Sequence, residues 1–325
     1  MNRRATITNG LLLATFIIVA LIRLRVGGGD LSTPVLQLRA ARLATGATVG
    51  AALAVAGVFL QALLRNPLAS PDLLGLASGS GFAVMAAVKL GLVGAAGVAA
   101  TGLGALSSTG AAVVGAVGAL GLTYTLSQRR GLLDPVLLVL TGVVVSIVCS
   151  AGTMLIRHLL PFQESEVADR MLRGALREDV SAPEYIVVGG LTLVGIIVGV
   201  AVGRAMDATS LSEDEALSVG VPLAALRRTL FILSGLLTAG SVVLAGPIGF
   251  VGLICPHLVR LLAGPGHRAL VLGSALAGAT LVVLADIAIR VIELPTGRLP
   301  ISVLTAIIGG PAFVVLLRRQ VRGLT

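Results

Sequence analysis

The sequence predicts an all-α polytopic membrane protein with about ten transmembrane helices. Hydrophobic residues make up 56% of the 325 residues and charged residues only 12%, whereas a soluble domain carries about 25% charged residues. The mean hydropathy is +1.03, so there is too little charge to coat a water-facing core of this size. Glycine is abundant, at 42 residues, and small residues let helices approach closely within lipid.

The apolar runs set the number of crossings. A hydrocarbon core of about 30 Å needs roughly 20 apolar residues per helix. The run from 73 to 127, broken by Lys89, is long enough for two crossings. We expect spans at 10–26, 43–64, 73–96, 104–127, 132–158, 185–205, 228–247, 249–263, 269–290 and 300–317. They form a single transmembrane domain over 1–325, and an even number of spans places both ends on one side.

The basic residues give a weak orientation signal. Their excess on one side of the membrane places both termini in the cytoplasm. The first apolar run is not followed by a small-residue cleavage motif, so we interpret it as an anchor and not as a cleaved signal peptide.

The first long polar segment is 161–184. Between its prolines, apolar residues recur at helical spacing with arginines on another side. This pattern predicts a short amphipathic helix on the outer surface, at about 165–177. A helix at the mouth of a pathway and a helix on the lipid surface fit the pattern equally.

The second polar segment is 207–228, on the cytoplasmic side. Ser212 and Glu215 form a capping box, which predicts a helix start. Gly220 is placed to end that helix in a left-handed conformation, and Pro222 suits the first turn of the next one. We therefore expect two short helices around a tight corner, either as a docking surface or as an ordinary ordered loop.

Several chemistries are absent from the sequence. The chain has one lysine and no Gly-Lys pair, so it contains no Walker A phosphate-binding loop. No HExxH motif or dense cluster of His, Cys, Asp and Glu occurs. We therefore expect no catalytic residue, no metal site and no cofactor. The net charge of +9 does not indicate a nucleic-acid partner, because the basic residues lie mostly between apolar runs, where they meet lipid headgroups.

One acidic residue lies deep in a predicted span. Asp286 falls near the outer end of 269–290, and an acid within the membrane is a functional candidate. Arg290 follows it at i+4, so a simple ion pair within one helix is an equally good interpretation.

Five stretches resemble the FecCD family, the permease subunits of ABC importers for iron-siderophores, haem and cobalamin. The stretches are LQLRAARLATGATVGAALAVAGVFLQALLRNPLASPDLLGLASGSG at 36–81, ALSVGVPLAALRR at 216–228, LAGPIGFVGLICPHLVRLLAGPGHR at 244–268, LADIAIR at 284–290 and LPISVLTAIIGGPAFVVLLRR at 299–319. They follow the family's order along nearly the whole chain. One departure lies at Arg298–Ser302, where family members usually carry Glu-Leu-Pro before the last helix.

The resemblance implies a type II ABC importer permease fold in the bacterial cytoplasmic (inner) membrane. It implies a second permease subunit, identical or paralogous, two ATP-binding cassette subunits on the cytoplasmic side and an extracytoplasmic substrate-binding protein. It also implies a non-catalytic transport subunit, with ATP hydrolysis on the partner. The cargo is then a ferric siderophore or a related metal chelate, such as haem or cobalamin.

The resemblance also assigns residues to three sites. The binding protein would dock on Arg39, Arg42 and Arg290. The ATPase subunits would dock on the coupling helices at 211–227, through Leu211, Ser212, Glu215, Ala216, Leu217, Gly220, Val221, Pro222 and Arg227. The gate and pathway would include Gln128, Leu133, Asp134, Pro135, Thr141, Ser146 and Ser150.

The alternative function is a secondary transporter without an ATPase partner. That class requires inverted repeats or several intramembrane charges, and neither is visible in this sequence.

Overall fold

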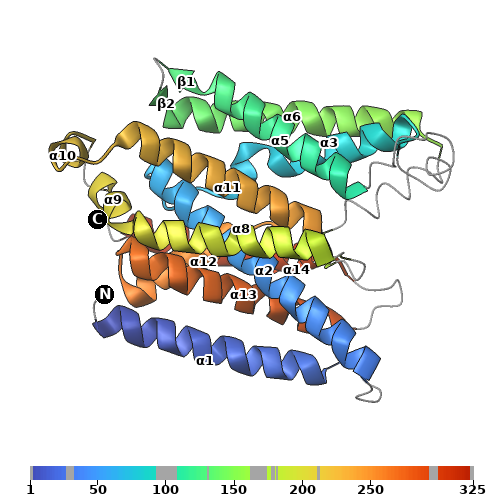
Figure 1. Cartoon of the computed structure of the whole chain (residues 1–325), viewed down its shortest axis with the longest axis horizontal. Helices are drawn as coiled ribbons and strands as arrows, with labels where there is room; N and C mark the ends of the chain where they lie inside the picture. Colours follow the sequence, from blue (N-terminus) through green and yellow to red (C-terminus); the bar gives the residue numbers. More distant parts are fainter. Residues whose placement is uncertain are drawn as a thin grey trace.

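A computed structural model describes residues 3–26, 33–92, 108–129, 132–161, 174–176, 180, 182–210, 213–292 and 299–322. Each of the ten expected spans coincides with a helix. These are α1 (Arg3–Arg25), α2 (Thr33–Leu64), α3 (Leu76–Lys89), α5 (Ser108–Leu126), α6 (Pro135–Leu159), α8 (Ala182–Ala201), α11 (Leu223–Ala245), α12 (Val251–Ala263), α13 (His267–Val291) and α14 (Ile301–Arg322). The helices run roughly along one common direction (Figure 1), so the predicted all-α membrane fold is confirmed.

Seven of these helices are long and apolar enough to cross a membrane, whereas α3, α12 and the apolar part of α14 are shorter. A helix rises 1.5 Å per residue, so the 14 residues of α3 and the 13 of α12 cover only about 20 Å each. Each of these two helices is therefore shorter than the roughly 30 Å thickness of a bilayer core.

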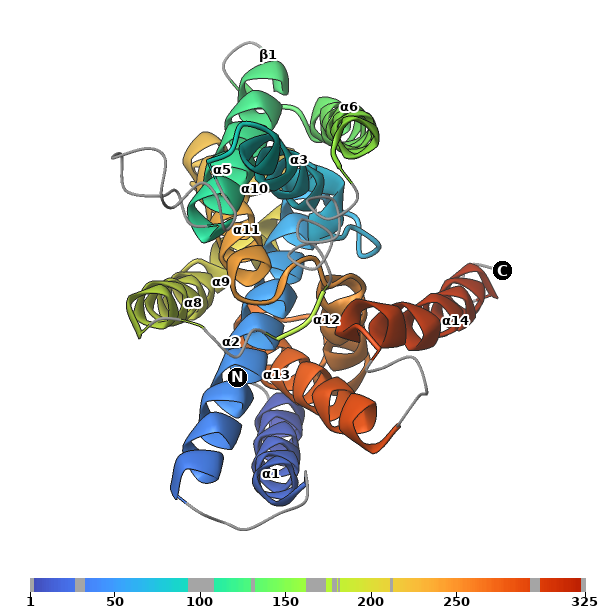
Figure 2. The ribbon, with the colours of Figure 1, turned by 90° about the vertical axis from the view of Figure 1, so that its right-hand side faces the viewer.

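Helix α2 lies at the centre and packs against α11, α12 and α13 (Figure 2). Glycine makes these contacts possible. A Cβ on Gly50 would lie 2.1 Å from the Gly278 carbonyl oxygen of α13, and one on Gly57 would lie 1.8 Å from the Gly252 oxygen of α12. The helix backbones thus touch directly, as expected where packing and not water exclusion drives association.

Helices α3, α5 and α6 form a second group beside this core (Figures 1 and 2). The short 3₁₀ helix η1 (Pro71–Leu74) connects the α2 end to α3 and packs on α6. A Cβ on Gly142 of α6 would lie 1.8 Å from the Leu73 carbonyl oxygen. Much of the α6 surface remains exposed in the single chain.

Three details differ from the sequence expectations. Helix α2 starts at Thr33, ten residues before the expected span, and most of its first two turns are exposed in the single chain, Leu36 and Leu38 among them. A two-stranded hairpin, β1 (Gln128–Arg129) and β2 (Leu132–Leu133), precedes α6. Residues 174–176 are not helical, so the outer helix expected at 165–177 is wrong at these three positions. Its other positions lie outside the described residues.

Candidate functional site

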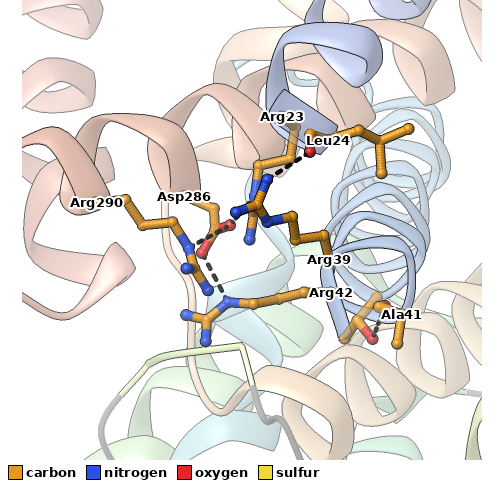
Figure 3. A network of polar contacts seen from close by, with 8 residues as sticks. Arg23, Leu24, Arg39, Ala41, Arg42, Asp286 and Arg290 are labelled. Carbon is orange, nitrogen blue, oxygen red and sulfur yellow. Dashed lines mark hydrogen bonds and ion pairs between the residues drawn. The ribbon is translucent and has the colours of Figure 1, made fainter. Parts of the chain in front are cut away.

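A carboxylate surrounded by arginines lies near the C-terminal end of α13 (Figure 3). Asp286 is 1% exposed. Its Oδ2 lies 2.5 Å from Nε of Arg23 on α1, and its Oδ1 lies 3.1 Å from Nε of Arg42 on α2. Arg290, one turn further along α13, places its Nε 3.7 Å from Oδ2. Ion pairs to a single carboxylate therefore join three helices.

Among the residues that the structure describes, this cluster holds three arginines and one carboxylate. Three guanidinium groups face one carboxylate, and Arg23 is fully buried with no hydrogen-bond partner for Nη1 or Nη2. Burying charges is costly unless they are well paired. The Arg42 and Arg290 side chains are 12% and 16% exposed, so they are the members of the cluster that reach the surface.

The structure brings together two of the three arginines predicted for docking. Arg42 and Arg290 meet at Asp286, whereas Arg39 donates from Nη1 to the Leu24 oxygen at 2.9 Å and the Arg25 oxygen at 3.4 Å. Arg39 thus satisfies carbonyls at the end of α1, where a cation is favourable.

Arg23 was not identified from the sequence. The available signal was the unbalanced acid at Asp286, but the sequence pattern pointed to Arg290 at i+4. The Arg290 ion pair exists, yet it is the longest of the three. Hydropathy does not reveal which other helix supplies the closer partner.

The cytoplasmic segment forms the predicted corner. Helix α10 (Glu213–Ser218) ends with the Gly220 N–H donating to the Leu217 oxygen and the Val221 N–H donating to the Ala216 oxygen. Gly220 has φ +80. This is a Schellman ending, which needs a left-handed residue after the helix.

Pro222 is the residue before α11, and a short helix α9 (Gly203–Thr209) precedes α10. Within the corner, Ala216 is buried while Leu217 and Val219 are 56% and 70% exposed. Exposed apolar side chains beside a rigid turn form a surface that a partner could cover. The predicted Leu211 and Ser212 lie outside the described residues, so the capping box remains a prediction.

The predicted gate loop contains the β1–β2 hairpin. Gln128 pairs with Leu133, and the Asp134 carboxylate accepts from the N–H groups of Val136 and Leu137 at 2.9 and 3.2 Å. Asp134 is thus the N-cap of α6, with Pro135 at its first position. Arg227 Nη1 donates to the Leu133 oxygen at 3.5 Å, so the hairpin contacts the helix that follows the coupling corner.

Of the three pathway residues predicted on α6, Ser146 and Ser150 lie one turn apart beside the start of α3, whereas Thr141 lies toward α5. Ser150 bonds Ser78 of α3 through their hydroxyl oxygens at 3.4 Å. Ser146 is half-buried beside Gly75, and Thr141 lines an apolar hollow of about 290 Å³ with α5 residues. They do not form one polar stripe within the single chain.

The N-terminal end of α13 has its own polar contact. Asp207 of α9 accepts from the His267 backbone N–H at 2.8 Å, and its Oδ1 lies 2.7 Å from His267 Nδ1. Partial burial raises the pKa of the Asp207 carboxyl, but hydrogen bonds from His267 and the charges of His267 and Arg268 outweigh it and lower the pKa. The contact ties the segment before α10 to α13.

Comparison with known proteins identifies the family. Residues 8–319 match the model of the FecCD transport family. The chain is 36% identical over 297 residues to the cobalamin import system permease protein BtuC of Halobacterium salinarum, covering 88% of this chain and 74% of the relative. It is 34% identical over 316 residues to the vitamin B12 import system permease protein BtuC of Escherichia coli O17:K52:H18, covering 91% of this chain and 89% of the relative.

Solved structures agree with this result. A structure described as an inward-facing ABC transporter of the metal-chelate type superposes with a TM-score of 0.82 at 31% identity, covering 97% of this chain and 99% of that chain. PsaBC from Streptococcus pneumoniae, at 16% identity and a TM-score of 0.50 over 80% of this chain and 92% of that chain, shares the fold alone. The chain belongs to the FecCD transport family and is a multi-pass permease of the ABC importer type.

Proposed function

We propose that this chain is the membrane-spanning subunit through which an importer passes a metal chelate, driven by ATP hydrolysis on partner subunits. The cargo class is a ferric siderophore, haem or cobalamin, and the BtuC relatives support including cobalamin. The chain works with a second permease subunit, two ATP-binding cassette subunits and an extracytoplasmic binding protein in a bacterial cytoplasmic membrane. It is not itself an enzyme.

The observation that carries the proposal is the coupling corner within a chain that matches the FecCD model from 8 to 319. An exposed pair, Leu217 and Val219, sits on a turn fixed by Gly220. A membrane protein gains nothing from such a surface in water, because exposed apolar area is unfavourable unless a partner covers it. In our proposal, the partner that covers Leu217 and Val219 is the ATPase subunit.

The direction of the chain in the membrane supports the same assignment. The labelled N and C ends lie at the end of the molecule that also carries α9 and α10 (Figure 1). Both termini and the coupling corner are then cytoplasmic, and the Asp286 cluster faces the binding protein. Arg42 and Arg290 are the docking residues that the structure favours, because their side chains reach the surface. Arg39 is the weaker candidate of the predicted three.

The gate assignment rests on the hairpin contact. The Arg227 bond to Leu133 gives the corner a direct route to the start of α6. A displacement of the corner would move the hairpin and Asp134, and so alter the cytoplasmic end of the pathway. A secondary transporter would have no use for this connection, and the family match offers that alternative no support.

Uptake of labelled chelates tests the proposal. A strain lacking this subunit should lose uptake of one of three probes, a ferric siderophore, haem or cyanocobalamin, and regain it with the plasmid-borne gene. Purification of the tagged chain should recover an ATP-binding cassette subunit, and this recovery should fall with Leu217→Glu. Normal uptake of all three chelates in the deleted strain, together with no copurifying ATPase, would refute the proposal.

A further inference from the structure

Two half-length helices start at the same place inside the membrane region. Helix α3 follows Gly75 at φ +75 and helix α12 follows Phe250 at φ +69. The 3₁₀ helix η1, which leads into α3, touches the start of α12, because a Cβ on Gly252 would lie 2.7 Å from Cδ of Pro71. Irregular backbone from two distant parts of the chain therefore meets at one point.

The depth of this point follows from its contacts with α6. Leu73 packs against Gly142, and Gly75 packs against Ser146. Helix α6 spans 25 residues, or about 37 Å, and these two residues lie about 10 and 16 Å from its cytoplasmic start. The meeting point is thus well inside the membrane-spanning part of α6.

An acidic side chain is exposed there. Asp72 is exposed in the single chain. Its Oδ2 accepts from the Ser70 hydroxyl at 3.0 Å, and a Cβ on Gly249, just before α12, would lie 3.6 Å from the same oxygen. No arginine, lysine or histidine among the described residues forms an ion pair with it. Asp72 is therefore an acidic side chain beside the membrane-spanning part of α6, and it has no cationic partner in the part of the chain that the structure describes.

Such a group cannot face lipid. Non-helical backbone at this depth occurs only where protein buries it or where it lines a water-filled cavity, and an intramembrane carboxylate faces a bundle interior or a water-filled path. The α2–α3 connection lies on the side of the molecule between α6 and α14 (Figure 2). Water on that side is the environment that exposed Asp72 requires.

We propose that Asp72 lines the translocation pathway and selects chelates by charge, so that this permease passes neutral and cationic chelates faster than anionic ones. The inference rests on the proposed function, and it narrows the cargo class. A fixed carboxylate in a narrow, partly dehydrated path repels an anionic cargo and attracts a cationic one. A second permease subunit carrying the same aspartate would double the effect.

A purely structural role for Asp72 would give a different result from charge selection. Asp72 also accepts the hydrogen bond from the Ser70 hydroxyl beside Gly249, just before α12, and that role needs only an acceptor oxygen. Asp72→Asn keeps an acceptor and removes the charge, whereas Asp72→Glu keeps the charge. Asp207→Asn is a matched control, because Asp207 likewise accepts hydrogen bonds beside a helix start but lies in the cytoplasmic helix α9.

The test uses the assembled importer in proteoliposomes with saturating binding protein, so that maximal rates report the permease step. The probes are ferric trihydroxamates that differ only in one pendant group, a free amine, an acetamide or a succinyl carboxylate, and cobalamin with its amine and monocarboxylate derivatives. Wild type should transport the amine form faster than the carboxylate form. Asp72→Asn should lower this ratio by roughly three- to tenfold, while Asp72→Glu and Asp207→Asn should keep it.

The outcomes separate the two proposals. If wild type transports a chelate but Asp72→Asn leaves the ratio unchanged, the charge selection is wrong and the importer function stands. If wild type transports no chelate of either set, the proposed function itself fails. If Asp72→Asn does not assemble, Asp72→Cys in a chain with Cys149→Ser and Cys255→Ser provides the second measurement. Membrane-impermeant thiol reagents should modify the introduced thiol at position 72 in the assembled complex. If this thiol is not modified either with or without ATP, residue 72 does not line the pathway.

Discussion

Asp286 and Asp207 hold opposite ends of the same helix, α13, in different surroundings. The Asp286 side chain is 2% exposed and contacts three arginines from α1, α2 and α13. The Asp207 side chain is 45% exposed and bonds one residue, His267. The outer end thus depends on buried charge, where an unpaired group is very costly, and the cytoplasmic end depends on hydrogen bonds that water can replace. This difference suits an outer end that stays assembled and a cytoplasmic end that moves.

The largest expected effect comes from removing the outer carboxylate. Asp286→Ala leaves buried guanidinium groups without their shared partner, so it should cost about 3–5 kcal/mol of unfolding free energy. Arg23→Met should cost clearly less, because Arg42 and Arg290 still neutralise Asp286 and two Arg23 nitrogens lack partners already. Denaturant titration in detergent measures both. Equal costs for the two variants would show that Asp286 is not the centre of the cluster.

The next effect concerns docking at the outer end. Arg42→Gln and Arg290→Gln should each weaken binding-protein association by about 2 kcal/mol, or roughly 30-fold in Kd, if each arginine meets a carboxylate of the partner. Glutamine is preferable to glutamate here, because Arg42→Glu would place a second carboxylate beside buried Asp286. Affinity for nanodisc-held complex is the measurement.

Arg39→Gln is the matched control for docking, since Arg39 is 6% exposed and bonds the carbonyls of α1. It should leave the affinity within about twofold of wild type, well under 1 kcal/mol. If Arg39→Gln lowers the affinity for the binding protein as much as Arg42→Gln does, all three arginines form the docking pocket, as the sequence predicted.

At the cytoplasmic end, Gly220→Val should cost about 1 kcal/mol or more locally, because a β-branched residue resists the left-handed conformation. Nothing lies within 4 Å of a Cβ at Gly220, so the cost is conformational and not steric. Membrane insertion should survive while chelate-stimulated ATP hydrolysis by the complex falls. Gly190→Val in α8 has equal space around it and should keep coupling. Wild-type coupling in Gly220→Val would mean that the corner is an ordinary loop.

The smallest effect is expected at Asp207. Losing its bond to the α13 start should cost about 1 kcal/mol or less in Asp207→Ala, as for other exposed helix caps. The pKa of Asp207 is lowered from 3.8 in the folded chain. The contribution of the Asp207 carboxylate to the free energy of unfolding is therefore complete above the unfolded pKa of 3.8. This contribution is lost as the pH falls through the lower pKa of the folded chain. Thermal unfolding should show wild type losing its advantage over Asp207→Ala as pH falls below about 4, and an advantage that stays constant to the most acidic pH would contradict the lowered pKa.

The sequence predicted the spans well because hydropathy reports burial from water, and the ten runs each became a helix. It placed the corner at Gly220 because a left-handed residue and its capping partners are local. It did not predict Arg23 as the partner of Asp286, since that contact joins residues 263 positions apart. It also did not predict the 128–133 hairpin, whose two short strands carry no alternating pattern. Contacts between helices that are distant in the sequence depend on how their side chains pack together, and this packing cannot be read from a single sequence.

The backbone contact between Gly50 and Gly278 has a mechanical consequence. Side chains elsewhere absorb small displacements by changing rotamer, but no side chain separates α2 from α13 at this point. We therefore expect these two helices to move together as one rigid unit. Spin labels at the two ends of this unit should keep a constant separation through the ATP cycle, while a label on α6 moves relative to both.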